Sequence, residues 1–229
     1  YYSLGGVLAD DMGLGKTIQT ITFLLSKIQN AGGKYLVVCP SSVVFNWERE
    51  FQQFAPEVKT LVISGSIDER SGQLEYALNS DETDVLITSY PLIQRDIEYY
   101  KKHIFQTIVL DESQNVKNDA AKTTKAVKRL RANNIFALSG TPIENNLNEL
   151  WSLFSIVLPG LFQSKKSFHE LSEEEISQKI DIFVLRRLKE DVLDDLPPKT
   201  ETVEFIELSD EQKRLYQTQL SLIKNDVES

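Results

Sequence analysis

The sequence predicts an α/β fold, an open and mainly parallel sheet with helices on both faces. Short apolar runs recur up to residue 140, and most of them are separated by stretches long enough for a helix. That alternation is typical of βαβ units. Several runs also end in a polar residue, as at Asp10, Ser89, Asp111 and Ser139. Because ligands bind along the carboxyl edge of such sheets, we expect a binding site there.

The expected strands lie, in chain order, in the runs GGVLAD, KYLVVCP, KTLVIS, DVLITSY, QTIVLDE and NIFALSG. Helices are expected between them, over residues 17–28, 43–54, 121–130 and 146–157. From residue 163 the chain becomes polar and charged, with sparse apolar positions. We therefore divide it into an α/β part, 1–162, and a helical extension, 163–229, that ends in a helix over 209–229.

Composition limits the possible functions. The 229 residues are 41% apolar, enough for a sizeable core, and the net charge of −9 opposes a uniformly basic nucleic-acid surface. The single cysteine, Cys39, excludes a disulfide framework and a cysteine-rich zinc site, which fits a reducing intracellular compartment. No apolar run approaches the roughly 18 residues of a membrane span. We expect a soluble excerpt of a longer polypeptide, with no membrane contact.

The stretch DDMGLGKT, residues 10–17, predicts a nucleotide site. An apolar strand, a turn with two glycines, and a lysine and threonine that open a helix form the phosphate-cradling arrangement called the P-loop. Lys16 would neutralise phosphates and the Thr17 hydroxyl would reach Mg²⁺. Asp10 occupies the first glycine position of the general pattern, and its physical role is open. The expected nucleotide-binding residues of this loop are Asp11, Met12, Gly13, Leu14, Gly15, Lys16 and Thr17.

Two later runs carry further candidates. TIVLDESQ places Asp111 to hold Mg²⁺ and Glu112 to polarise the attacking water, at the end of another strand. Taken alone, this acidic pair is as typical of a solvated strand end as of a catalytic site, but the presence of the P-loop favours the catalytic interpretation. LSGTP offers the hydroxyls of Ser139 and Thr141, either in an ordinary capped turn or in a relay between nucleotide and polymer. Trp47 is interpreted as a core anchor.

At this point the sequence resembles a known family. LADDMGLGKTIQTI, YLVVCPSSVVFNWEREFQQF, VLITSY, VLDESQNVKN, LSGTPIENNLNELWSLFSIVLPGLF and FVLRRLKEDVLDDLPPKTE occur in the order found in Swi/Snf-type ATPases, double-stranded DNA translocases of helicase superfamily two. The resemblance spans nearly the whole chain. It implies a RecA-like P-loop NTPase lobe, followed by an extension toward a second RecA-like lobe that lies outside these residues.

The resemblance also implies residue roles. Lys16, Asp111 and Glu112 would be catalytic, with the metal held by Thr17 and Asp111. Gln114 stands where many members have histidine, and it would hydrogen-bond near the γ-phosphate. Coupling of nucleotide state to movement would involve Gln114, Ser139, Gly140 and Thr141. The implied DNA-contact candidates are Pro40, Ser41, Thr88, Ser89, Tyr90, Arg186 and Arg187.

The expected function follows from this resemblance. The whole protein would bind ATP with Mg²⁺, hydrolyse it in response to duplex DNA, and remodel complexes of DNA-bound proteins without separating strands. It would act in the nucleus of a eukaryote, or in the cytoplasm or nucleoid of a bacterium or archaeon. The isolated lobe is expected to hydrolyse ATP poorly. Two alternatives stay open, a strand-separating helicase of the same superfamily and a nucleotide-binding scaffold without catalysis.

Overall fold

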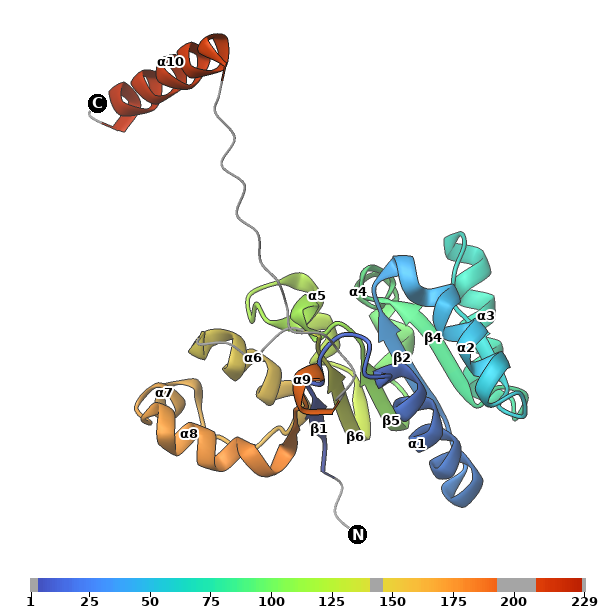
Figure 1. Cartoon of the computed structure of the whole chain (residues 1–229). Helices are drawn as coiled ribbons and strands as arrows, with labels where there is room; N and C mark the ends of the chain where they lie inside the picture. Colours follow the sequence, from blue (N-terminus) through green and yellow to red (C-terminus); the bar gives the residue numbers. More distant parts are fainter. Residues whose placement is uncertain (1–3, 141–145, 193–208, 228–229) are drawn as a thin grey trace. The chain divides into compact units, whose positions relative to one another are not determined.

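The computed structural model describes residues 4–140, 146–192 and 209–227. Within these residues the strands form a seven-stranded sheet of order β3-β4-β2-β5-β6-β1-β7, in which neighbouring strands pair in parallel. Figure 1 labels its central strands. The predicted α/β class is confirmed. The strands are β1 (Gly6–Leu8), β2 (Tyr35–Cys39), β3 (Thr60–Val62), β4 (Val85–Ser89), β5 (Ile104–Leu110), β6 (Arg131–Leu138) and β7 (Val184–Leu185).

The first six strands occupy the six predicted runs, and β7 was not predicted. Two residues are too few to show a strand pattern in the sequence, and β7 exists because it pairs with β1. Val7 lies opposite Val184 and Leu8 opposite Leu185. The edge of the sheet next to β1 is therefore formed by chain from the far end of the lobe.

The four predicted helices are present as α1, α2, α5 and α6. The α-helices are α1 (Lys16–Ala31), α2 (Val44–Phe54), α3 (Ile67–Asn79), α4 (Tyr90–Tyr100), α5 (Lys122–Val127), α6 (Leu147–Val157), α7 (Lys165–His169), α8 (Glu173–Ile180), α9 (Lys189–Val192) and α10 (Asp210–Val227). The expected terminal helix is α10. Among the described residues, no helix is long and apolar enough to cross a membrane.

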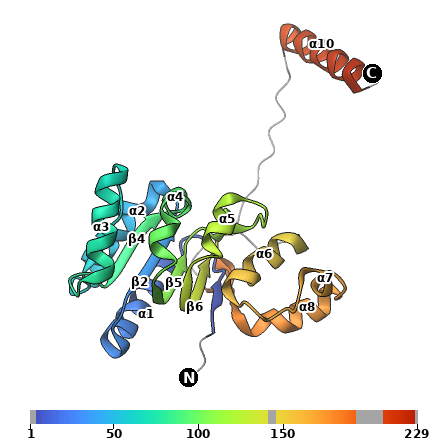
Figure 2. The same cartoon turned by 180° about the vertical axis from the view of Figure 1, so that it is seen from behind.

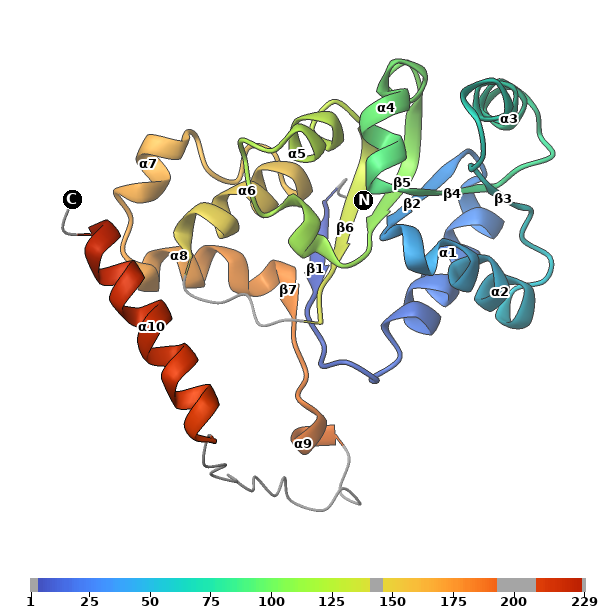
Figure 3. The same ribbon diagram turned by 90° about the horizontal axis from the view of Figure 1, so that it is seen from above.

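Helices cover both faces of the sheet. Buried residues of α1 and α2 share one core with side chains of β2, β4 and β5, and buried residues of α3 to α8 share the core on the opposite face. The two layers are visible from behind and from above (Figure 2, Figure 3). Strands β2 and β4 are buried along their whole length, as expected for central strands of a parallel sheet. This rigid sheet fixes the positions of the loops at its carboxyl edge.

The chain forms two compact units, Tyr1–Leu193 and Asp194–Ser229. The predicted boundary after residue 162 falls inside the first unit, between α6 and α7. Phe168 of α7 and Ile176 of α8 are buried in the same core as Leu153 of α6. The first part of the extension therefore packs with the α/β lobe, and the role of 163–229 as a link toward a second lobe stays a prediction.

Candidate nucleotide site

The P-loop connects β1 to α1 at the carboxyl edge of the sheet. Gly13 and Gly15 have φ angles of 89° and 74°, which glycine adopts readily and other residues adopt only with strain. Gly15 is the N-cap of α1, and it has no side chain to cover the first N–H groups of the helix. The N-terminal end of a helix attracts anions because its backbone donors are unpaired and its dipole is positive there. The loop has the local geometry of a phosphate site.

Lys16 lies against the backbone of its own loop. Its Nζ donates to the carbonyl oxygens of Asp10 at 2.7 Å and Asp11 at 3.2 Å. Gly140, just after β6, approaches the same ammonium: a Cβ at this position would lie 3.6 Å from Lys16 Nζ and 2.9 Å from Cγ of Met12. A side chain at residue 140 would force the exposed Met12 side chain to shift, so glycine allows the two loops to approach each other without that change. The structure thus brings Gly140 and Lys16 together.

Asp111 follows β5 and is held from both carboxylate oxygens. The indole Nε1 of Trp47 donates to Oδ2 at 2.8 Å, and the backbone N–H of Glu112 donates to Oδ1 at 2.9 Å. The hydroxyl of Tyr90 donates to the backbone oxygen of Asp111 at 2.7 Å. Trp47 is therefore more than the predicted core anchor. Its sequence signal was general: a buried indole N–H requires an acceptor.

The charge of Asp111 is poorly compensated. Burial raises the pKa of this carboxyl above its usual range, and the nearby charge of Glu112 adds to the effect, whereas the Trp47 hydrogen bond and the charge of Lys16 lower it. Among the described residues, no cationic side chain forms an ion pair with Asp111. Mg²⁺ prefers hard oxygen ligands and typically uses one or two carboxylates together with substrate phosphates. A half-buried, oriented carboxylate without a counter-ion among the described residues fits that cation, with Thr17 at the start of α1 as the second candidate ligand.

Glu112 has an unusual backbone. Its φ of 47° and ψ of 59° lie in the left-handed region, which is uncommon for a residue other than glycine and recurs at functional sites. The side-chain Nε2 of Gln114 donates to its carboxylate at 2.8 Å. The structure therefore brings the candidate base and the predicted coupling residue Gln114 into direct contact.

The other predicted coupling residues lie at the end of β6. Ser139 is buried, and its backbone N–H donates to the carbonyl of Leu8 at 3.0 Å, which joins the ends of β6 and β1. Thr141 lies outside the described residues. Because β5, β6 and β1 are neighbours in the sheet, the Asp111, Ser139 and Lys16 loops lie along one edge.

Of the DNA-contact candidates, Pro40 and Ser41 lie at the start of the short helix η1 (Ser41–Val43), where Ser41 is exposed. The segment Thr88, Ser89 and Tyr90 is different, because all three residues are at most 3% exposed. The Tyr90 hydroxyl donates a hydrogen bond to the backbone oxygen of Asp111 instead of facing solvent. These buried side chains expose almost no surface that could contact DNA in this structure. The predicted DNA contact of this segment would therefore have to be made by its backbone.

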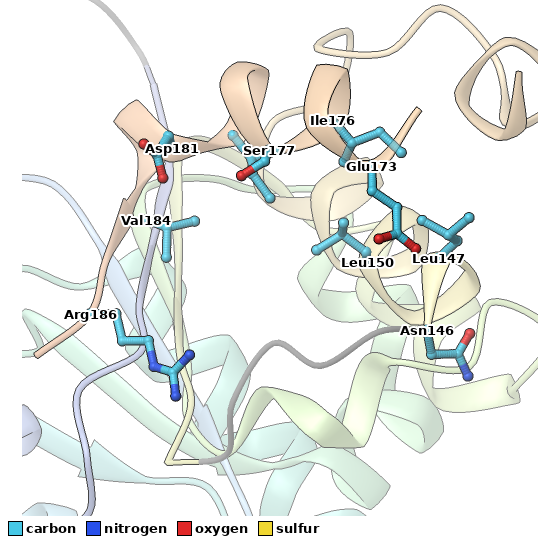
Figure 4. Close-up of a pocket in the computed structure, with 10 residues that line it drawn as sticks. Asn146, Leu147, Leu150, Glu173, Ile176, Ser177, Asp181, Val184 and Arg186 are labelled. Atoms are coloured by element: carbon cyan, nitrogen blue, oxygen red, sulfur yellow. The ribbon is translucent and has the colours of Figure 1, made fainter. Parts of the chain in front are cut away.

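The two arginines after β7 point in different directions. Arg186 lines a pocket of about 430 Å³ between α6 and α8, and its guanidinium extends into that space (Figure 4). Arg187 instead forms an ion pair with Asp10 and donates to the side chain of Gln19. The family resemblance implied a DNA contact for Arg187, and the role of Asp10 was open. The only hint was an aspartate where the general loop pattern has glycine.

Fold and site together define a class of protein, a RecA-like lobe with a P-loop and an acidic pair on a neighbouring strand. The chain matches the SNF2-related domain family over residues 2–229 and belongs to it. The predicted resemblance to Swi/Snf-type ATPases is confirmed.

Relatives and solved structures agree with this assignment. The chain is 40% identical over 225 residues to an uncharacterized ATP-dependent helicase of Mycoplasma genitalium, covering 94% of this chain and 21% of the relative. It is 35% identical over 240 residues to the ISWI chromatin-remodeling complex ATPase ISW2 of Saccharomyces cerevisiae, covering 99% and 21%. The SWI2/SNF2 ATPase core of Sulfolobus solfataricus, solved in complex with dsDNA, matches with a TM-score of 0.75 and 36% identity, covering 98% of this chain and 49% of that core. The chain thus spans about a fifth of these relatives and half of the solved core.

Proposed function

We propose that this chain is the ATP-binding lobe of a DNA-dependent ATPase that translocates on double-stranded DNA and remodels protein–DNA complexes. Family membership supports the class of activity. The relative ISW2 is a chromatin-remodeling ATPase and the Sulfolobus core was solved with dsDNA, which supports ATP and duplex DNA as ligands. The observation that carries the proposal is the convergence of three loops at one edge of the sheet. They bring Lys16, Gly140 and the oriented Asp111 to the ends of β1, β6 and β5.

Each group has a defined task in this proposal. The backbone donors at the start of α1 and the ammonium of Lys16 bind the phosphates of ATP. Thr17 and Asp111 would hold Mg²⁺, which neutralises charge on the phosphate oxygens when bound. Glu112 polarises the attacking water, and the 2.8 Å bond from Gln114 fixes its carboxylate.

Movement requires parts outside this lobe. A second RecA-like lobe of the same chain would close on the site, supply transition-state arginines and alternate between open and closed states. Ser139, Gly140 and Thr141 would pass the nucleotide state to the DNA-contact surface, for which Ser41 and Arg186 have exposed positions and Pro40 a partly exposed one. The isolated lobe should therefore turn over ATP about 10³-fold more slowly than the whole protein, because an arginine finger contributes about that factor.

The test is ATP hydrolysis by the full-length protein with and without blunt duplex DNA. We expect stimulation by the duplex, loss of turnover and of nucleotide binding in Lys16→Ala, and loss of turnover with retained ATP binding in Glu112→Gln. Normal turnover by Glu112→Gln would exclude the proposed base.

Two further measurements separate the alternatives. Unwinding of a tailed duplex would identify a strand-separating helicase, and we expect no unwinding. Absence of ATPase activity under all DNA conditions, with nucleotide still bound, would identify a scaffold. Fast hydrolysis by the isolated lobe would contradict the proposed need for a second lobe.

A further inference from the structure

The start of the P-loop is fastened to the segment after β7. The N–H of Asp11 donates to the carbonyl of Arg187 at 3.0 Å, the N–H of Arg187 to Oδ1 of Asp10 at 3.0 Å, and the N–H of Lys189 to Oδ2 of Asp11 at 3.1 Å. The first of these bonds extends the backbone pairing of β1 with β7 beyond both strands, and the other two add side-chain acceptors to it. The Lys189 side chain also reaches the centre of the loop, where its Cε would lie 3.3 Å from a Cβ on Gly13.

Charge reinforces this connection. Asp10 is 0% exposed, and the Nε of Arg187 lies 3.1 Å from each of its carboxylate oxygens, in addition to the ion pair through Nη2. Burial by itself would raise the pKa of Asp10, but hydrogen bonds from Arg187 and Gln19 and the arginine charge outweigh it, and the pKa is lowered. A buried carboxylate is costly without a counter-charge, so the two side chains hold each other in place.

The guanidinium also reaches the far side of the loop. Arg187 donates to Oε1 of Gln19 in the first turns of α1, and Nε2 of the same amide donates to the carbonyl of Leu14 at 2.9 Å. On the near side, the Asp10 carbonyl accepts from Lys16 at 2.7 Å. Arg187 therefore supports the loop at both ends of the turn that carries the phosphate-binding lysine.

We propose that Asp10, Gln19 and Arg187 are positioning residues for nucleotide binding, a clasp that keeps the P-loop in its phosphate-binding shape and ties that shape to the segment after β7. The inference rests on the proposed function, since it takes the loop to bind ATP. It gives Arg187 a task other than the DNA contact implied by the family resemblance. The segment after β7 belongs to the same compact unit as the loop, a few residues before that unit ends at Leu193.

The experiment measures equilibrium binding of the fluorescent nucleotide mant-ADP with Mg²⁺ to the full-length protein, without DNA and well below the unfolding temperature. Arg187→Gln should weaken binding by roughly 3- to 30-fold, the usual range for residues that act through others. Arg187→Lys should also weaken it, because lysine keeps the charge but cannot bond in bidentate fashion. Asp10→Asn provides a variant should Arg187→Gln fail to fold. Arg129→Gln is the matched control, because it removes a surface ion pair, with Glu98, and should bind as the wild type does.

A double-variant cycle tests whether the residues act together. The double variant Asp10→Asn, Arg187→Gln should have about the same dissociation constant as whichever single variant binds mant-ADP less tightly, because both changes break the same interaction. Fully additive losses would overturn the clasp. So would a lowered melting temperature with an unchanged dissociation constant, which is the signature of a purely structural brace.

Two other outcomes have distinct meanings. If Arg187→Gln and Arg186→Gln both weaken binding of a blunt duplex and neither changes mant-ADP binding, Arg187 is a DNA contact and the clasp is wrong. If Lys16→Ala binds mant-ADP as tightly as the wild type, the proposed function fails at its first step. The clasp fails alone when Lys16→Ala weakens binding and Arg187→Gln does not.

Discussion

Asp10 and Asp111 occupy comparable places and have opposite electrostatics. Both follow a strand at the same edge of the sheet, β1 and β5. Asp10 receives a guanidinium from within the chain, and its pKa is lowered. Within the part of the chain that the structure describes, the donors to the Asp111 carboxylate are the neutral N–H groups of Trp47 and Glu112, and burial raises its pKa. The difference shows that the fold itself supplies a counter-charge to Asp10, whereas it orients Asp111 with neutral donors, as the proposed metal role of Asp111 would require.

The largest expected effect separates the two carboxylates by turnover. In the full-length protein, Asp111→Asn should lower kcat for ATP by about 10²-fold or more, since it removes the proposed metal ligand. Asp10→Asn should change kcat at saturating ATP by less than about threefold, because its effect falls on nucleotide affinity. Steady-state kinetics over a range of ATP concentrations checks both, and equal losses of kcat would erase the distinction.

The support of Asp111 gives the next effect. Trp47→Phe keeps an aromatic ring beside Phe51 but removes the N–H that orients Oδ2. Loss of such outer-shell support typically weakens metal binding by about 10- to 100-fold. We expect the Mg²⁺ concentration that gives half-maximal ATPase activity to rise by at least about 10-fold. The Mg²⁺ concentration that gives half-maximal binding of mant-ADP should rise by the same factor.

Trp151→Phe is the control for this experiment, because Trp151 packs on Phe168 away from the carboxylate. It should leave the Mg²⁺ requirement unchanged. An unchanged requirement in Trp47→Phe would mean that the indole only fills space.

The pH dependence of stability should differ in sign. A lowered pKa, as for Asp10, gives stability that is present above the unfolded value near 3.8 and is lost as pH falls through the folded pKa. A raised pKa, as for Asp111, gives stability that is present below that value and is lost as pH rises through the folded pKa. Below pH 3.8, the melting temperature of Asp10→Asn should therefore fall less steeply with decreasing pH than that of the wild type. Just above pH 3.8, the melting temperature of Asp111→Asn should fall less steeply with increasing pH than that of the wild type.

The effect at neutral pH is modest. Asp10→Asn should lower the melting temperature by roughly 2 to 6 °C, as expected for loss of a charge-assisted hydrogen-bond network. Coincident pH profiles for the wild type and both variants would show that neither carboxylate is perturbed.

The smallest effect is a spectroscopic change at Trp47. In a full-length protein that keeps Trp47 but carries Trp151→Phe, addition of Mg²⁺ and ADP should alter the emission of the indole bonded to Asp111. Tryptophans outside this chain are replaced in the same background. The same titration of Asp111→Asn should give no change, and an equal response there would place the cation elsewhere.

Local patterns predicted much of this structure. The six longer strands, the P-loop and the acidic pair after β5 each lie within a few consecutive residues, where hydrophobic runs and turn glycines are directly legible. The contacts between Asp10 and Arg187 join residues 177 positions apart, and no local pattern encodes such a pair. The burial of Tyr90 was also missed, because a polar strand end looks the same whether it faces solvent or a neighbouring strand.

Strand β7 has a consequence for how the protein is made. It follows β1 by most of the length of the lobe, so the partner of Asp10 is synthesised 177 residues after it. At about 5–20 residues per second, the ribosome needs roughly 9 to 35 s to cover that distance. During this interval the nascent chain contains Asp10 but not yet Arg187, whose guanidinium is its counter-charge in the folded lobe. The proposed nucleotide site should therefore be among the last features to mature during translation, and truncated chains that stop before Arg187 should form their central strands but bind nucleotide weakly.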